Sequence, residues 1–280
     1  KKTWIIDPKN DLGITQKGIA SETILPLLTS KSIKAISDKH GHVDLIIARH
    51  ILEHAPDTQG FLSAIWDMLN PDGYIVFEVP DCSRALETLD YSCPWEEHVL
   101  YFTQDTFEQT LILGGFSPTR FECYPYPFEN SLVGIVTTGG NGEKASNDEK
   151  RIQKNRINWQ SYTQSLEIRR QSLRDKLTEV RSTQGKVALF GAGHLAAFYI
   201  NLLGIADLVE FVVDDNPHKK GLHMPGSLLP ILSSNMLVEH GIKLCLLSLS
   251  PESENKVIVG NREALSINKI YLKTKISVSN

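Results

Sequence analysis

Apolar and polar positions alternate through residue 138 in a way that predicts strands separated by helices. Near-continuous apolar runs at Thr3–Ile6, Val43–Ala48 and Gly73–Val79 predict buried strands. Thr58–Leu69 carries apolar residues at helical spacing, and Asn70–Gly73 (NPDG) predicts a tight turn into the next strand. Buried strands that alternate with helices are typical of a parallel, doubly wound α/β sheet.

The pattern then predicts an edge pair and a domain boundary. Thr106–Gly114 predicts a helix, and Tyr124–Tyr126 with Leu132–Thr138 predicts an antiparallel pair that closes the sheet. Residues 139–150 are small and polar and have no periodicity, which indicates a linker. A charged helix follows to about Arg181, and its single apolar stripe is too short for a coiled coil, so we expect it to pack on a domain.

The alternation of strands and helices starts again at Gly185. Strands are predicted at Val187–Phe190, Val209–Val213 and Lys243–Leu249, and a turn with a helix at Gly191–Leu203. The sequence therefore predicts three parts: a first α/β domain at 1–138, a polar linker and helix at 139–183, and a smaller α/β domain at 184–280.

Composition limits the partners and the compartment. The 280 residues carry a net charge of −4 with no basic stripe, which argues against nucleic acid or an anionic membrane as partner. The four cysteines are scattered without a C-x-x-C pair, so we expect reduced thiols in the cytoplasm rather than a disulfide framework. No apolar run approaches the roughly 20 residues of a membrane span, and the first residues do not resemble a signal peptide. The oligomeric state stays open.

A glycine turn opens the second domain. Gly191 and Gly193 belong to a G-x-G-x-x-A pattern between a predicted strand and helix, and Asp214 ends the next strand about 20 residues later. This arrangement suits a dinucleotide, because the glycines admit a phosphate near the helix and the acid accepts ribose hydroxyls. Lys219, in the turn that follows, suits phosphate or simply solvent. The glycines equally suit close helix–strand packing, or a related module that binds another nucleotide or none.

Two histidine clusters follow predicted strand ends in the first domain. Ala48–His54 (ARHILEH) ends one strand, and Trp95–Phe102 (WEEHVLYF) follows the strand that ends near Pro80. Ligands of open α/β sheets bind at the carboxyl ends of the strands, so both clusters are expected at one cleft. A histidine oriented by a carboxylate is a natural general base. No helix carries H-x-x-x-H with a third ligand, so no metal site is predicted.

At these residues the sequence resembles a known family. VDLIIARHILEH (Val43–His54) and LNPDGYIVFEVPD (Leu69–Asp81) resemble the central strands of S-adenosylmethionine-dependent methyltransferases. EEHVLYFTQDTF (Glu96–Phe107) and LILGGF (Leu111–Phe116) narrow the resemblance to nucleotide-sugar C-methyltransferases that act on dTDP-linked deoxysugars. The stretch at 187–232, VALFGAGHLAAFYINLLGI and FVVDDNPHKKGLHMPGSLLPIL above all, resembles the C-terminal domain of that family.

The resemblance implies a fold, a reaction and a set of site residues. The fold is a truncated class I, Rossmann-like methyltransferase domain followed by a smaller Rossmann-like domain. The reaction is C-methylation of a keto deoxysugar nucleotide, in which a base removes a proton beside the carbonyl and the enolate attacks the methyl group of S-adenosylmethionine. The expected catalytic residues are His54, Glu97 and His98, with Glu97 orienting an imidazole. The expected cofactor contacts are Asp7, which holds the ribose hydroxyls, Arg49 and His50; the expected substrate or nucleotide contacts are Glu78, Pro80, Gly191, Gly193, Asp214 and Lys219.

The sequence also departs from the family. The usual Tyr-His-Glu-His reads Trp95-Glu96-Glu97-His98 here, which removes one candidate acid or base. The donor glycine loop and the cysteine-rich zinc module of the family do not occur in the sequence, so we expect weak binding of S-adenosylmethionine. Two alternatives stay open: a non-catalytic nucleotide-sugar-binding protein or fragment, and an NAD(P)-dependent oxidoreductase that uses the glycine turn. Asp7 could equally cap a turn before Pro8.

Overall fold

The computed structural model describes residues 3–16, 24–95, 97–126, 129–138, 148–249, 251–261 and 268–271. The chain divides into two compact units. Unit 1 comprises Lys1–Leu86 and Cys93–Ile157, and unit 2 comprises Glu87–Ser92 and Asn158–Asn280. Most of the predicted linker at 139–150 lies outside the described residues. None of the helices in the described part of the chain combines the length and the hydropathy of a membrane span.

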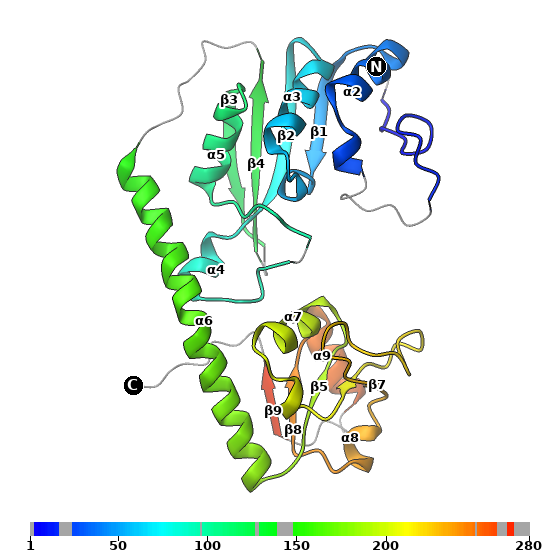
Figure 1. Ribbon diagram of the computed structural model, residues 1–280, viewed down its shortest axis with the longest axis vertical. Coiled ribbons are helices and arrows are strands. Elements are labelled where there is room, and N and C mark those ends of the chain that lie inside the picture. The colour runs from blue at the N-terminus through cyan, green and yellow to red at the C-terminus, as the bar shows by residue number, and fades with distance from the viewer. Residues whose placement is uncertain are drawn as a thin grey trace. The chain divides into compact units, whose positions relative to one another are not determined.

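Unit 1 is built on a mixed four-stranded sheet. Its strand order is β1 (Val43–Arg49), β2 (Leu69–Asp81), β4 (Asn130–Thr137) and β3 (Ser117–Tyr124), as Figure 1 shows. β1 and β2 are parallel, whereas β4 runs antiparallel to both β2 and β3. The antiparallel pair at one edge of the sheet is confirmed, but its first strand begins at Ser117 rather than near Tyr124.

The helices of unit 1 begin at polar caps. Thr29 and Thr103 form capping boxes at the starts of α2 (Ser30–His40) and α5 (Gln104–Leu113), and Asp57 accepts the Gly60 N–H at the start of α3 (Thr58–Met68). These caps satisfy backbone N–H groups that have no partner within the helix. The shorter helical elements are η1 (Leu25–Leu27), η2 (Leu52–His54) and α4 (Ser83–Thr88).

One face of the unit 1 sheet forms the core. Alternate residues of β2 are fully buried and pack with apolar residues of the three helices; the principal members are Ile33, Ile36, Phe61, Leu62, Ile75, Phe77, Val79, Phe107 and Leu111. Residues of the opposite face are more open: Leu45 is 53% exposed and Ile47 is 63% exposed. The prediction that β1 is a buried strand therefore holds for only one of its two faces.

Two predictions for unit 1 were wrong. Thr3–Ile6 is not a strand; Trp4 and Ile6 pack against the core while Ile5 is exposed, and the chain turns at once into Pro8–Leu12. Asn70–Gly73 lies within the bounds of β2 instead of forming a separate turn. Asp72 has a φ of 64°, and the pairing with β1 shifts register between Val43 and Leu45, so the strand contains an irregularity where the turn was expected.

Unit 2 is built on a parallel five-stranded sheet. The strand order is β7 (Ile231–Leu232), β6 (Val212–Val213), β5 (Val187–Phe190), β8 (Leu244–Leu247) and β9 (Asn268–Tyr271). All four pairings are parallel, and every residue of β5 is buried. The strand order reverses at β5, because β6 is added on one side of it and β8 on the other. Such a reversal is the topological switch point of a doubly wound fold.

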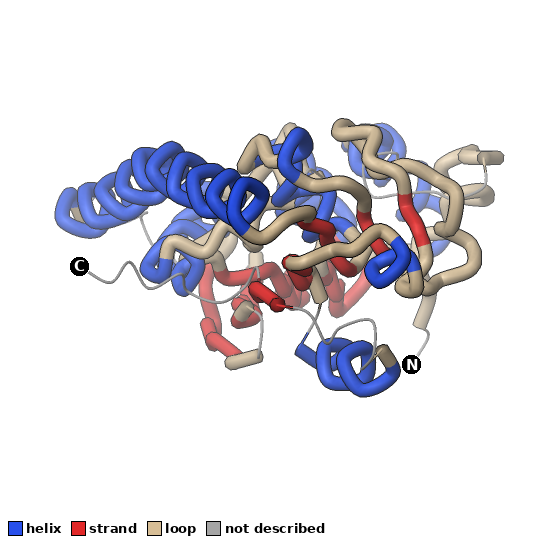
Figure 2. Tube along the Cα trace, turned by 90° about the horizontal axis from the view of Figure 1, so that it is seen from below, coloured by secondary structure: helices blue, strands red, loops and turns tan. Residues whose placement is uncertain are grey.

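Unit 2 includes most of the longest helix of the described chain. Figure 2 shows α6 (Glu149–Thr183) as one continuous helix, and Leu173, Leu177 and Val180 of its apolar stripe belong to the unit 2 core. The other helical elements are α7 (His194–Leu202), η3 (Ala206–Leu208), α8 (Met236–Glu239) and α9 (Pro251–Gly260). The expectation that the stripe packs on a domain is confirmed.

Candidate functional site

The carboxyl end of β1 turns sharply and presents three polar side chains. His50 follows the strand with a φ of 49°, a left-handed conformation that is uncommon outside glycine, and its N–H donates to the Glu78 carbonyl at 2.9 Å. The chain then enters η2 directly. This turn places His50, Glu53 and His54 beside the ends of β1 and β2.

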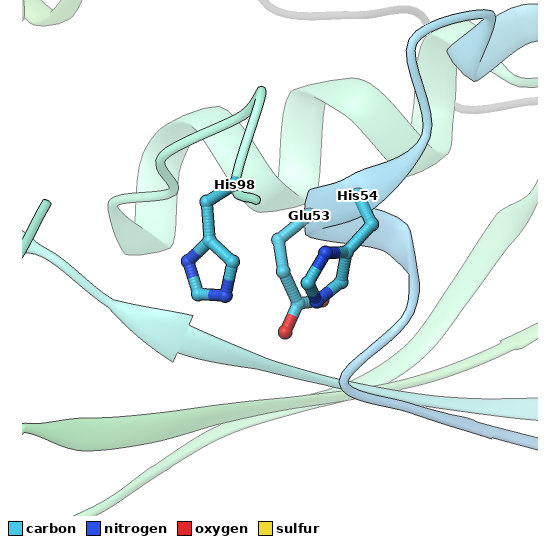
Figure 3. Close-up of side chains that lie close together, drawn as sticks. All are labelled: Glu53, His54 and His98. Carbon is cyan, nitrogen blue, oxygen red and sulfur yellow. The ribbon is translucent and has the colours of Figure 1, made fainter. Parts of the chain in front are cut away.

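A second segment, residues 95–101, is fastened to this turn by its backbone. The Val99 and Leu100 N–H groups both donate to the Glu53 carbonyl, at 2.9 and 3.0 Å. The Tyr101 hydroxyl accepts from the Trp95 N–H and donates to the Trp95 carbonyl, each at 3.0 Å. His98 is thereby brought edge-on to His54, with 4.7 Å between the ring centroids (Figure 3). The structure therefore unites the two histidine clusters that the sequence placed at one sheet edge.

Glu53 lies beside these rings, and the sequence analysis did not predict it as a site residue. Its side chain is only 2% exposed, and neither carboxylate oxygen has a hydrogen-bond partner among the described residues. The His50 Nδ1 approaches Glu53 Oε1 at 3.4 Å. Burial raises the pKa of the Glu53 carboxyl, and the neighbouring His50 and His54 act in the opposite direction. A glutamate is rarely buried in this way without a charged or hydrogen-bonding partner.

The contact between His54 and Glu97 is made by the backbone. His54 Nδ1 lies 3.0 Å from the Glu97 carbonyl oxygen. A carbonyl can only accept, so Nδ1 carries the proton, and the lone pair of the neutral ring is on Nε2. The Glu97 residue is exposed. We predicted that the Glu97 carboxylate orients an imidazole, and this role stays a prediction. The buried carboxylate that the structure places beside both rings is that of Glu53 (Figure 3).

A charged pair lies next to the histidines. The Arg49 guanidinium binds the Glu78 carboxylate across neighbouring strands, and the Ser131 hydroxyl donates to Glu78 at 3.0 Å. Arg49 above all lowers the pKa of Glu78. His50 Nε2 lies 3.6 Å from the same carboxylate. Arg49, His50 and Glu78, predicted separately as cofactor and substrate contacts, thus form one ionic cluster at the sheet edge.

A small pocket adjoins the cluster. Pro80, Glu53 and His98 line it together with Cys82, Tyr101 and Glu129. Pro80 is near the carboxyl end of β2, as the sequence predicted, and an imidazole and a buried carboxyl line the same pocket.

Asp7 has a local structural role. Its carboxylate accepts the Asn10 N–H at 2.7 Å, and its own N–H donates to Asp11 at 2.8 Å. Asp7 therefore opens a turn, as the alternative interpretation held, and it does not follow a strand. Binding of ribose hydroxyls by Asp7 stays a prediction.

Residues of unit 2 itself pack against and hydrogen-bond to its glycine turn. A Cβ at Gly191, where φ is 104°, would lie 2.5 Å from the Ser248 carbonyl oxygen, whereas a Cβ at Gly193 would meet nothing within 4 Å. One Asp214 oxygen accepts from the Ala192 N–H at 3.0 Å and from Lys219 Nζ at 3.1 Å. Lys219 Nζ also donates to the Ala192 carbonyl at 2.9 Å. Gly191 thus serves close packing, and Asp214 and Lys219 bind the turn itself, which weakens the case for NAD.

Comparison with known proteins also divides the chain into two domains. The model of a methyltransferase domain matches residues 9–119, and the model of a C-methyltransferase C-terminal domain matches residues 141–266. Over these two ranges the chain is similar to a methyltransferase domain and to a C-methyltransferase C-terminal domain. The resemblance found in the sequence is confirmed for both domains.

Individual relatives are distant. The C-methyltransferase NovU of Streptomyces niveus is 21% identical over 243 residues, which are 84% of this chain and 58% of NovU. Among solved structures, 1,6-didemethyltoxoflavin-N1-methyltransferase of Burkholderia thailandensis, with S-adenosylhomocysteine bound, is 23% identical and shares 33% of this chain and 42% of its own, at a TM-score of 0.27. LepI in complex with S-adenosylmethionine is 16% identical over 40% of this chain and 34% of its own, at 0.26. The chain spans little more than half the length of NovU.

Proposed function

We propose that this C-methyltransferase-type chain takes part in the S-adenosylmethionine-dependent methylation of a carbon atom in a nucleotide-linked keto sugar. The observation that carries the proposal is the pair His54 and His98, held edge-on at the carboxyl ends of two parallel strands beside a buried carboxyl. The two matched domains and the name of the relative NovU support it. The choice of a sugar nucleotide as the substrate is based on the resemblance of the sequence to the family and on that relative.

In this proposal the imidazoles remove a proton from carbon. A C–H bond next to a ketone is acidic enough for a histidine to act as its general base. His54 offers Nε2 as the proton acceptor, since its Nδ1–H donates to the Glu97 carbonyl. His98 offers a second imidazole, whose ring centroid lies 4.7 Å from that of His54. The positive charge that develops on the ring lies next to the Glu53 carboxyl, which stabilises it when ionised.

The residues at the sheet edge fit a cationic donor in part. S-adenosylmethionine, when bound, supplies a methyl group on a sulfonium for the carbanion to attack. Glu78 is a partly buried carboxylate at the carboxyl end of β2 that suits a cation, and Arg49 and His50 suit a carboxylate or ribose hydroxyls. Residues 3–16 and 24–42 contain no strand before β1, and the ends of β1 and β2 offer the donor contacts described here beside the one predicted for Asp7.

Proton removal can be tested without the donor. The protein is incubated in D₂O with a dTDP-linked 4-keto deoxysugar, and loss of the C–H signal beside the carbonyl is followed by NMR. We expect exchange with the native chain and a loss of about 100-fold or more in His98→Asn, the range that general bases contribute. Binding of the sugar nucleotide, measured by calorimetry, should survive the substitution.

The outcomes of this experiment are distinct. Full exchange in both His98→Asn and His54→Asn would remove the imidazoles from the proton-transfer step. Tight binding of the sugar nucleotide with no exchange in the native chain would overturn the proposal and leave a binding protein. Methyl transfer itself is then followed with radiolabelled S-adenosylmethionine, for the chain alone and for the longer protein.

A further inference from the structure

The buried carboxyl of Glu53 lacks a hydrogen-bonding partner for either of its oxygens within the described residues. Its side chain is 2% exposed, and His50 Nδ1 approaches Oε1 at 3.4 Å, which is long for a hydrogen bond. An ionised carboxylate in such a position needs a compensating charge, because desolvation costs far more than one long contact returns. A bound cation would supply that charge.

Two imidazoles lie where they can share such a cation. Glu53, His54 and His98 each offer one ligand atom, and these atoms all lie within 4.8 Å of one another. Figure 3 shows the Glu53 side chain beside the two rings, with His54 and His98 on separate segments of the chain. The segments are joined by the bonds of Val99 and Leu100 to the Glu53 carbonyl, so the backbone fixes the three ligands relative to one another.

The His54 ring is also oriented as metal-bound histidines usually are. Its Nδ1 lies 3.0 Å from a backbone carbonyl oxygen, which fixes the tautomer and places the lone pair on Nε2. Most histidine ligands have such a partner on the nitrogen that does not bind the metal. This observation is independent of the buried carboxylate and indicates the same ligand.

The chemistry of the donors selects the metal. Two imidazole nitrogens and one carboxylate oxygen suit Zn²⁺ and its transition-metal neighbours, whereas Mg²⁺ and Ca²⁺ prefer oxygen alone. Three protein ligands leave a fourth tetrahedral position for water or a substrate oxygen. We propose that Glu53, His54 and His98 form a binding site for one divalent transition-metal ion of the Zn²⁺ type. The sequence analysis did not predict this site, because its ligands are not spaced along one helix.

This inference goes beyond the proposed function and does not depend on it. A metal-bound imidazole has no lone pair left for a proton, so the metal and the proposed proton transfer compete for His54 and His98. Metal binding is measured without donor or sugar, and the exchange reaction is measured after chelation. Each proposal can therefore fail while the other stands.

The test uses the full chain without an affinity tag. The protein is stripped with a chelator and titrated with Zn²⁺ in competition with a chromophoric chelator, and we expect one tight equivalent. Glu53→Gln and His98→Asn should each weaken it more than about 100-fold, which exceeds the 10- to 100-fold effect of outer-shell changes. The control His218→Asn, which alters an exposed histidine of unit 2, should bind as the native chain does.

Two further measurements protect the result against misfolding and against the cysteines. Zn²⁺ should raise the unfolding temperature of the native chain and not that of Glu53→Gln, provided that both have the same circular dichroism. Co²⁺ should give visible bands of a tetrahedral site without the near-ultraviolet band of a thiolate ligand. A thiolate band, undiminished binding in the ligand variants, or no stoichiometric Zn²⁺ in the native chain would each overturn the proposal.

Discussion

Asp11 is the most enclosed charge of the amino-terminal turn, with a side chain that is 2% exposed. Its carboxylate accepts from Lys39 Nζ at 2.6 Å and from His40 Nε2 at 3.0 Å, at the carboxyl end of α2. These partners, Lys39 first, hold the pKa of Asp11 well below its ordinary value. The cluster links residues 7–14, which are not a strand, to a helix of the unit 1 core.

We expect Asp11→Asn to lower the free energy of unfolding of unit 1 by about 1–3 kcal/mol at neutral pH, the range for hydrogen bonds to a charged group. The pKa is depressed in the folded state, so this stability is present above the unfolded pKa of 3.8. It is lost as the pH falls towards the folded value. The measurement is amide exchange of the turn, compared between the two proteins from neutral to acid pH.

The control for this prediction is the exposed pair of Lys34 and Asp38, one helical turn apart at 3.2 Å. Asp38→Asn should change stability by less than about 1 kcal/mol at every pH, because surface ion pairs contribute little. Equal effects of the two substitutions, or a native-to-Asp11→Asn difference that persists unchanged into strong acid, would contradict the assigned role of Asp11.

How far the sequence predicted the site can be judged from single residues. His54 and His98 could be predicted to meet, because both follow strand ends and parallel strands share a carboxyl edge. Glu53 could not, since a glutamate between Leu52 and His54 is normally exposed, and its burial depends on the left-handed turn at His50. For Asp7 the sequence leaves two roles open, because an aspartate that accepts a backbone N–H in a turn is the same residue type as a ribose contact.

At the scale of secondary-structure elements, the glycine turn before α7 separates two interpretations of one motif. Both Gly191 and Gly193 fit a dinucleotide fingerprint in sequence, yet the structure gives them different surroundings. Gly191 has a φ of 104° and contacts the Ser248 carbonyl, whereas Gly193 caps α7 with a φ of −104° in open space. The motif is therefore explained at its first glycine by packing between β5 and β8.

We expect Gly191→Ala to destabilise unit 2 by more than about 2 kcal/mol, since strain at positive φ adds to a clash with a backbone oxygen. Gly193→Ala, its matched control, should stay within about 1 kcal/mol, because its conformation suits any residue. Denaturant unfolding monitored by circular dichroism measures both. Equal losses would contradict the packing role, and saturable binding of NAD abolished by Gly193→Ala would revive the oxidoreductase.

The elements that the sequence predicted well are those with a clear period or cap. α3, α5 and β5 lie within a few residues of their predicted places because each has a strong apolar pattern. Thr3–Ile6 failed because four apolar or β-branched residues cannot show whether a strand partner is available. β1 has apolar residues on both faces, and its pattern could not reveal that Leu45 and Ile47 are exposed in this structure.

At the scale of the whole molecule, the two units have separate hydrophobic cores. The unit 1 cluster contains buried residues from Leu25 to Val136, and the two unit 2 clusters contain buried residues from Leu173 to Leu247. No described residue belongs to clusters of both units. α6 is assigned to unit 1 up to Ile157 and to unit 2 from Asn158, so the division falls inside the helix that the sequence predicted after the linker at residues 139–150.

Separate cores predict separate unfolding. Phe77 of β2 and Leu246 of β8 are both fully buried, each at the centre of its own sheet. We expect Phe77→Ala to lower the free energy of unfolding of unit 1 by about 3–5 kcal/mol, and Leu246→Ala to lower that of unit 2 by about 2–5 kcal/mol, from lost burial and the cavity that remains. Each substitution should leave the other unit within about 1 kcal/mol, since distant sites without shared partners behave independently.

Calorimetry resolves the transitions, and hydrogen exchange with mass spectrometry assigns each to a unit. If either substitution shifted both transitions by the same amount, the chain would unfold as one cooperative body, and the division within α6 would have no thermodynamic meaning.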